Sequence, residues 1–157
     1  MAGKDGGPPV KLITQNRKAR HNYEIEDTLE AGLVLVGTEV KSCREGKANV
    51  TDAYAIVKDG EAWLLGCHIS PYSHGNRENH DPERPRKLLL KRSEIELLHK
   101  RVSQEGRTLV PLRLYFKQGM VKAELAIARG KNLHDKRQST AKRDAERQMQ
   151  QALGRRR

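Results

Sequence analysis

The chain has 157 residues, and its 31 Lys and Arg against 20 Asp and Glu give a formal net charge of +11. This length favours one domain with a single modest core, and the charge favours a polyanionic partner, either nucleic acid or a membrane surface. No run approaches the ~18 apolar residues of a membrane span, and the N-terminus has no apolar stretch suited to a signal peptide. The sequence therefore predicts a cytoplasmic protein in which Cys43 and Cys67 are reduced thiols.

The first predicted elements precede residue 50. Residues 1–10 contain three Gly and two Pro and lack apolar periodicity, so they are predicted to form a flexible lead-in outside the fold. Residues 23–37, YEIEDTLEAGLVLVG, predict one or two strands with a bend or bulge at Gly32. Residues 38–47 can form about two turns of helix, ended by Gly46.

The middle of the chain predicts a hairpin and a helix. Two runs rich in β-forming residues between 49 and 69 are joined by Asp59-Gly60, a dipeptide that tolerates the positive φ of a tight hairpin turn. A capping box that starts at Ser93 and the helical spacing of Ile95, Leu98 and Val102 predict a helix over residues 94–105, packed on one face.

A second hairpin is predicted over residues 109–128, with its turn at Gln118-Gly119. Apolar residues alternate with polar ones along both strands. The alternation predicts that Val110, Leu112, Leu114 and Phe116 face the core and that Tyr115 and Lys117 face solvent.

Together these segments predict a mainly β protein with a few helices, an α+β chain of about five or six strands and two or three helices. Consecutive hairpins that must hide their edges favour a small closed β-barrel of the oligonucleotide-binding type with flanking helices. An open sheet with helices on one side is the alternative. We expect the RNA-binding β-barrel domain to span residues 11–129 and a disordered basic tail to span residues 130–157.

Basic clusters indicate which polyanion binds. The first runs from Asn16 to Tyr23 and mixes cations with two rings; it includes Lys18, Arg20 and His21. Such a mixture can neutralise phosphate and stack on unpaired bases, although a solvated turn followed by a core tyrosine would look the same. The second cluster holds Arg84, Arg86 and Lys87. With the tail they favour nucleic acid over a membrane, because the tail lacks an apolar face. The absence of a helix suited to the major groove favours RNA over duplex DNA.

Other sites were weighed and set aside. Cys67, His68, His74 and His80 could suggest zinc, but their spacing matches no common ligand pattern. Glu30 would lack an evident partner as a general base. The sequence predicts no metal, no cofactor and no enzyme. Two alternatives stay open, a general single-strand RNA-binding module and an RNA-processing enzyme.

Three segments carry a resemblance to a known family: NRKARHNYEIEDTLEAGLVLVGTEVKSCREGKANVTDAYAIVKDGEAWLLG, then DPERPRKLLL, then RGKNLHDKR. In order and spacing they resemble the SsrA-binding protein family, also called SmpB. The resemblance implies an oligonucleotide-binding-type barrel that holds the tRNA-like end of transfer-messenger RNA (tmRNA) and enters stalled ribosomes during trans-translation. It also implies a monomer within a protein–RNA complex.

The resemblance also implies roles for individual residues of the body. Asn16, Glu30 and Leu89 fall where the family places residues important for gripping RNA. The same surface would include Lys18, Arg20, His21, Tyr23 and Tyr54.

In the tail, residues 129–157 hold ten basic and three acidic side chains, which supply +7 of the net charge. Gly130 resembles the family's hinge, and His134 lies where the family stacks a ring on a base of small-subunit ribosomal RNA in the decoding region. Asn132 departs from the usual Lys. The residues that match the set lining the mRNA channel are Lys131, Asp135, Lys136, Arg137, Lys142 and Arg143. The tail would be helical only when bound there.

Overall fold

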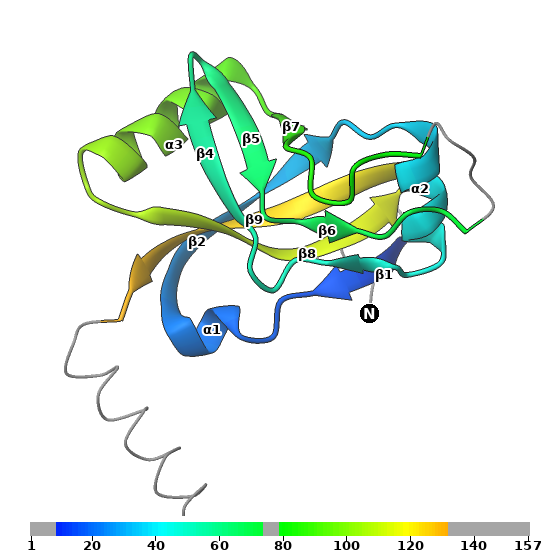
Figure 1. The fold of residues 1–157 in the computed structure, drawn as a ribbon. Helices are drawn as coiled ribbons and strands as arrows, with labels where there is room; N and C mark the ends of the chain where they lie inside the picture. The colour runs from blue at the N-terminus through cyan, green and yellow to red at the C-terminus, as the bar shows by residue number, and fades with distance from the viewer. Residues whose placement is uncertain (1–8, 74–78, 132–157) are drawn as a thin grey trace, which may run out of the picture.

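A computed structural model describes residues 9–73 and 79–131. The described chain is mainly β, with three helices placed around one large antiparallel sheet (Figure 1). This confirms the predicted class of a mainly β protein with few helices. No helix within the described ranges is long and apolar enough to span a membrane.

The large sheet has seven strands: β1 (Val10–Gln15), β2 (Tyr23–Leu33), β4 (Tyr54–Lys58), β5 (Glu61–Leu65), β7 (Arg86–Leu89), β8 (Thr108–Lys117) and β9 (Met120–Gly130). Their order is β1-β8-β4-β5-β7-β2-β9, and β8 also pairs with β9. Strands β8, β4, β5, β7, β2 and β9 therefore form a closed circuit of pairings, the strand circuit. Strand β1 pairs with β8 and lies outside this circuit. A separate two-stranded sheet joins β3 (Ala48–Asn49) to β6 (His68–Ile69).

Both predicted hairpins are present. The turn between β4 and β5 places Asp59 and Gly60 at φ of 53° and 76°. The turn between β8 and β9 places Gln118 and Gly119 at φ of 53° and 77°. Two consecutive positive φ angles characterise the two-residue turns whose twist matches that of the flanking strands.

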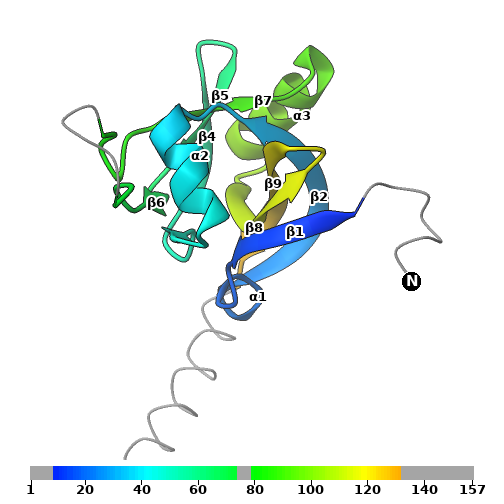
Figure 2. The ribbon, with the colours of Figure 1, turned by 90° about the vertical axis from the view of Figure 1, so that its right-hand side faces the viewer.

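The helices are α1 (Ala19–Asn22), α2 (Gly37–Arg44) and α3 (Arg92–Ser103). In α3 the carboxylate of Glu94 accepts the Lys91 N–H at 2.8 Å, so the helix starts two residues earlier than the Ser93 capping box predicts. Leu98 of this helix is fully buried, but Val102 is exposed. The buried face of α3 is therefore narrower than the spacing of Ile95, Leu98 and Val102 predicts. Figures 1 and 2 show α3 above and α1 below strands β8 and β9, with α2 next to β6.

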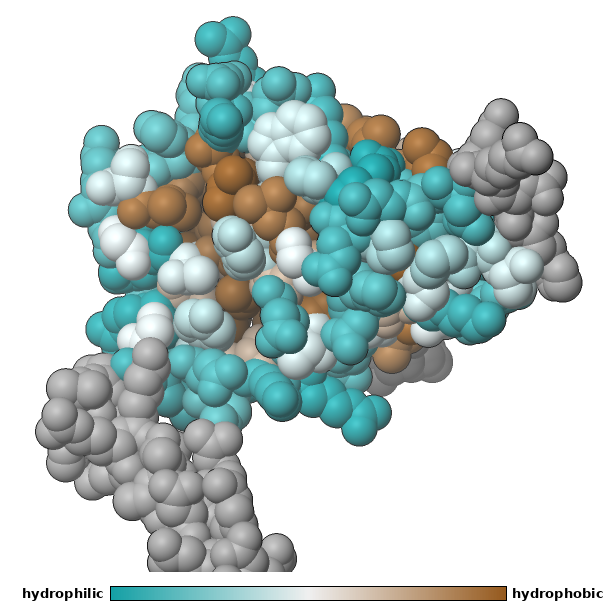
Figure 3. Space-filling view, in the orientation of Figure 1, coloured by the Kyte–Doolittle hydropathy of each residue, from teal (hydrophilic) through white to brown (hydrophobic). Residues whose placement is uncertain are grey.

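The core lies on the inner face of the strand circuit, where Leu64, Leu109, Leu114, Leu125 and Ile127 are almost fully buried. A smaller cluster on the other side of β8 and β9 contains Val110, Leu112, Ala126 and Ala128, with Ala19 of α1 packed on it. Figure 3 shows further hydrophobic side chains gathered between the β4–β5 hairpin and α3.

The predicted alternation along β8 is wrong in two places. The register of β8 on β9 shifts between Pro111 and Arg113, so Val110 and Leu112 face the smaller cluster while Leu114 faces the main core. A bulge of this kind adds one residue and reverses the side-chain parity beyond it. Tyr115, predicted to face solvent, is only 3% exposed.

Candidate nucleic-acid interface

Several predicted RNA-binding residues lie on the outward face of the sheet. Directly opposed residues of antiparallel strands share a face, as do residues two apart on one strand. Glu30 shares its face with Gly32, which pairs with Leu89 of β7. Lys87 lies two residues before Leu89 and pairs with Trp63 of β5, and Leu65 pairs in turn with Tyr54 of β4. The register thus places Glu30, Leu89, Lys87 and Tyr54 on one continuous surface.

Gly32 joins the first two of these residues through a close approach of β2 and β7. A Cβ atom at Gly32 would lie 3.2 Å from the Cβ of Leu89, tighter than ordinary contact. Leu89 is therefore seated directly over a glycine, with 48% of its surface exposed. The sequence predicts a bend or bulge at Gly32. Instead β2 is one continuous strand, and its register shift on β9 lies between Ile25 and Asp27.

Glu30 has partners that lie far away in the sequence. The hydroxyl of Tyr115 donates to its Oε2, and the Lys117 ammonium lies 3.2 Å from Oε2 and 3.4 Å from Oε1. The hydrogen bond from Tyr115 is the main cause that lowers the pKa of Glu30, and Lys117 and Lys122 lower it further. Burial and the bond to Glu30 raise the pKa of Tyr115. Glu30 is thus a carboxylate at neutral pH, held by a neutral phenol and a cation.

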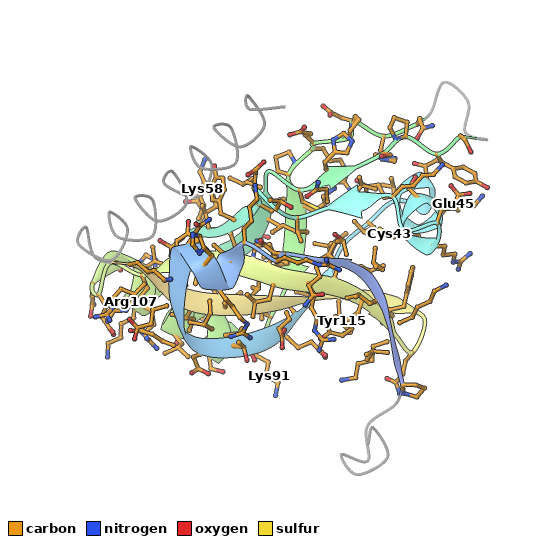
Figure 4. All side chains as sticks on the ribbon, turned by 90° about the horizontal axis from the view of Figure 1, so that it is seen from below. Cys43, Glu45, Lys58, Lys91, Arg107 and Tyr115 are labelled. Carbon is orange, nitrogen blue, oxygen red and sulfur yellow. The ribbon has the colours of Figure 1, made fainter. Side chains whose placement is uncertain are left out.

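Tyr115 and Lys117 are not among the residues that the sequence predicts to bind RNA. The alternation of apolar and polar residues along β8 predicts that both face outward. That alternation is the one sequence signal that could have identified them as surface residues. Tyr115 lies on β8 opposite Leu12 of β1, and Figure 4 labels its side chain there. The guanidinium of Arg113 lies 4.5 Å from the centre of the Tyr115 ring and 3.2 Å from a carboxylate oxygen of Glu124.

The first basic cluster forms a tight turn between β1 and β2. Ala19 anchors α1 to the smaller cluster, while Lys18 and Arg20 are exposed and His21 is half-buried. Tyr23 is also half-buried and packs against this cluster, as the alternative prediction of a core tyrosine requires. Part of its surface stays accessible to solvent. Because α1 follows β1 directly, the two cations lie at one end of the sheet (Figure 2).

Asn16 lies beneath this turn and is 7% exposed. Its Nδ2 donates to the carbonyls of Val50 at 3.3 Å and Pro111 at 3.2 Å, and its N–H donates to the Leu112 carbonyl at 2.7 Å. Its Oδ1 is buried and has no hydrogen-bond partner among the described residues. The amide nitrogen therefore holds three segments together.

The second basic cluster is mostly a buried ion-pair network. Glu39 of α2 accepts from Arg84 Nε at 3.1 Å and from Arg86 Nε at 2.7 Å, and neither Glu39 nor Arg86 is exposed. Arg86 also donates to the carbonyls of Cys67 and Pro82. Burial raises the pKa of Glu39, but the hydrogen bonds from Arg84, the Val36 N–H and Arg86 together bring it below its ordinary value.

The assignment of Arg86 to an RNA-binding surface is therefore wrong, because a fully buried side chain cannot contact RNA at the surface of this fold. The arginine satisfies a buried carboxylate and two carbonyls instead. Arg84 keeps 31% of its side chain exposed while paired to Glu39. Lys87 is 43% exposed and pairs with Glu61 at 2.5 Å.

The cysteines and histidines have structural surroundings. Cys43 and Cys67 are free and buried, and burial raises their pKa values to about 12 and about 11. His80 Nε2 donates to the Ile69 carbonyl at 2.8 Å, and its Nδ1 lies 2.9 Å from the Thr38 hydroxyl. In the described part of the chain no three His, Cys, Asp or Glu residues are placed to hold a metal ion. His74 lies outside that part.

Most of the predicted tail lies outside the described residues. Gly130 ends β9, and the Lys131 N–H lies 3.5 Å from the Asn22 carbonyl. The remaining tail predictions are outside the described residues: Asn132, His134, Asp135, Lys136, Arg137, Lys142 and Arg143.

Comparison with known proteins adds independent information. The chain is 60% identical over 146 residues to an SsrA-binding protein of Mycobacteroides abscessus, covering 93% of this chain and 92% of that protein. It is 59% identical over 145 residues to an SsrA-binding protein of Symbiobacterium thermophilum, covering 92% of each chain. A solved structure described as "tmRNA-SmpB: a journey to the center of the bacterial ribosome" matches with a TM-score of 0.65 and 50% identity, covering 76% of this chain and 85% of that one. The model of the SmpB protein family matches residues 13–155, and the chain therefore belongs to the SmpB family.

Proposed function

We propose that this protein binds the tRNA-like domain of tmRNA and delivers it to stalled ribosomes for trans-translation. Family membership supports this role, since the relatives are named SsrA-binding proteins and the solved relative is described with tmRNA in the bacterial ribosome. The observation that carries the proposal within this chain is that the strand register places Glu30, Leu89, Lys87 and Tyr54 on the outward face of the sheet.

The RNA-binding surface has two parts in this proposal. One is the outward face of the sheet, with Arg84 at its margin. The other is the basic turn that follows β1, where exposed cations lie near half-buried rings. Cations can neutralise phosphates there, and rings can stack on unpaired bases. The residues of the turn are Lys18, Arg20, His21 and Tyr23, with Asn16 supporting them from below.

The strand circuit fits this role. Strands β8, β4, β5, β7, β2 and β9 pair in sequence, and β9 pairs back to β8. We infer a barrel of the oligonucleotide-binding type, a fold whose curved outer surface presents side chains to nucleic acid. The domain would span residues 11–129 after the predicted lead at residues 1–10, although Val10 already belongs to β1. No catalytic step is assigned to it, and the role requires neither metal nor cofactor.

The tail would act on the ribosome. Residues 129–157 carry a net charge of +7, and the apolar residues there are too sparse to dock on the body. A channel walled by ribosomal RNA offers phosphates that can offset the free-energy cost of ordering such a segment. We propose that residues 130–157 fold only where mRNA is absent, with Gly130 as a hinge and Lys131 among the residues that line the channel. Action on the ribosome would place the protein in the cytoplasm as one copy in a protein–RNA complex.

Sequencing the RNA that co-purifies with the protein at moderate salt tests the proposal. We expect tmRNA to be strongly enriched over transfer RNA and ribosomal RNA fragments. A general single-strand RNA-binding module would instead return many RNAs with little preference. That result would reject the proposed function.

A further inference from the structure

The polar group centred on Glu30 is built from three neighbouring strands. On the outward face, Glu30 of β2 lies opposite Glu124 of β9, and Lys122 of β9 lies opposite Tyr115 of β8. Lys117 follows Tyr115 on the same face of β8. The group therefore places two carboxylates among cations on the surface where RNA binding is proposed.

Protein groups already occupy the Glu30 carboxylate. Its Oε2 accepts from the Tyr115 hydroxyl and from Lys117, and its Oε1 lies 3.4 Å from the same ammonium. Tyr115 is 3% exposed, and Arg113 stacks on its ring at 4.5 Å, so the phenol has little freedom to turn away. The buried phenol of Tyr115 therefore holds the Glu30 carboxylate in place. The carboxylate also accepts hydrogen bonds from the Lys117 ammonium.

Lys117 remains accessible although it is paired. Its side chain is 30% exposed, and that of Glu30 is 39% exposed. Lysine has three N–H donors, so the contact with Glu30 leaves donors for a phosphate oxygen. A free lysine side chain samples many rotamers, and a fixed ammonium loses less conformational freedom when it binds.

An unpaired carboxylate on an RNA-binding surface would repel phosphates. The charges around Glu30 offset this effect, since Lys117 and Lys122 both act on it and Arg113 pairs with Glu124 at 3.2 Å. The group as a whole carries three cations and two carboxylates. A carboxylate is favourable in such a place when it either orients a cation or accepts hydrogen bonds from a base.

We propose that Glu30 is a positioning residue that holds Lys117 as a phosphate-binding cation, and that Tyr115 fixes the carboxylate in place. The inference rests on the proposed function, because it names residues of the same RNA-binding surface. Glu30 then supports binding through Lys117 and makes no essential contact with a base. This distinguishes it from a residue that reads a base edge.

A double-mutant cycle with Glu30→Gln and Lys117→Met tests the proposal. Affinity is measured between 50 and 300 mM salt for two RNAs, the tRNA-like domain of tmRNA and an unrelated hairpin. Lys117→Met should weaken binding to the tRNA-like domain about five- to tenfold and reduce the salt slope by about 0.7–0.9, the effect of one lost phosphate contact. Glu30→Gln should weaken binding by a similar factor, because the ammonium is no longer held.

The combined variant carries the decisive result. Once Lys117 is removed, the carboxylate only repels phosphate, so adding Glu30→Gln should leave affinity unchanged or improve it. If Glu30 reads a base directly, Glu30→Gln costs the same factor in both backgrounds, and the proposal is overturned. Tyr115→Phe should reproduce part of the Glu30→Gln effect, and Lys117→Arg should retain the salt slope.

Arg92→Met provides a matched control, because Arg92 forms an exposed pair with Glu96 on α3. It should leave the salt slope unchanged, and an equal reduction would show that Lys117 acts only through net charge, which also overturns the proposal. Thermal melting of each variant establishes that the fold is intact. Failure of the wild-type protein to prefer the tRNA-like domain would reject the proposed function, while the cycle measured on whichever RNA binds still decides the role of Glu30.

Discussion

Glu39 on α2 and Arg86 on β7 form an ion pair in which neither side chain has any exposed surface. Arg86 also donates to the carbonyls of Cys67 and Pro82, so one guanidinium joins the helix, the strand and the intervening loop. Removing one member of such a pair leaves the other charge buried with fewer partners, which costs more than the pair contributes.

Arg86→Met should therefore destabilise the protein by about 3 kcal/mol, measured by denaturant unfolding. Lys87→Met is the matched control on the same strand, because its partner Glu61 and Lys87 itself are each 43% exposed. A pair of this kind contributes about 0–1 kcal/mol. Lys87→Met should instead weaken RNA binding. Equal stability losses in the two variants would contradict the distinction between a buried arginine and a surface lysine.

The acid limb of stability should depend on Glu39. Its pKa is lowered in the folded state, so its contribution is fully present above the ordinary value of 4.5 and is lost as the pH falls through the lower folded value. Glu39→Gln should reduce stability at pH 7 and flatten the decline of the unfolding free energy below about pH 4.5. Unfolding curves from pH 7 to pH 3 measure both effects. A variant whose acid limb parallels that of the wild type would show that other carboxylates determine the decline.

The third prediction concerns the stability of a variant at Asn16, a residue assigned to RNA binding. Asn16→Ala removes two hydrogen bonds to the buried carbonyls of Val50 and Pro111, so we expect a loss of about 1–3 kcal/mol in stability. A residue that contacted only RNA would leave melting near that of the wild type. The exposed neighbour Gln15 serves as the control, since Gln15→Ala should change the melting temperature little. Normal melting with lost RNA affinity would indicate that Asn16 contacts RNA directly.

Local signals predicted the parts of the fold that depend on neighbouring residues. Asp59-Gly60 and Gln118-Gly119 form the expected turns because each joins two runs of strand-forming residues and its Gly adopts positive φ without strain. Strand β1 was missed, since residues 10–15 become a strand by pairing with β8, about a hundred residues later. Helix α3 starts earlier than predicted because the Glu94 carboxylate accepts the Lys91 N–H, which makes Lys91 the N-cap residue in place of Ser93.

The candidate site was predictable as a set of residue types but not as a set of contacts. Arg86 looks like a surface cation in the sequence, and only the approach of Glu39 from 47 residues away makes its burial favourable. Glu30 seemed to lack a partner because Tyr115 and Lys117 lie 85 and 87 residues further along the chain. Pairings of this kind depend on strand register, which a pattern within one strand does not determine.

Truncation after Gly130 should separate RNA binding from action on the ribosome. Strand β9 ends at Gly130, and its pairings with β2 and β8 are complete by that residue. The truncated protein should therefore melt like the full chain and bind the tRNA-like domain with a smaller salt slope, because the charged tail is missing. It should fail to support tagging of stalled products in a reconstituted translation system. Loss of folding would contradict the domain boundary.

The final prediction concerns His134, which lies outside the described residues and is assigned through the family resemblance. An imidazole stacked on a base contributes about 1–3 kcal/mol, which is substantial beside screened contacts between cations and phosphates. His134→Ala should impair placement of the tail in the decoding region and hardly change binding of free tmRNA, which the body provides. Tagging of stalled products and tmRNA affinity, measured in parallel, test this separation. His134→Phe and His134→Trp should retain more tagging than His134→Ala, because they keep a ring face that can stack. They lose the hydrogen bonds of the imidazole, so retained tagging would identify stacking as the operative interaction. If His134→Gln rescued tagging and the aromatic variants did not, hydrogen bonding would be the operative interaction and the stacking assignment would be wrong.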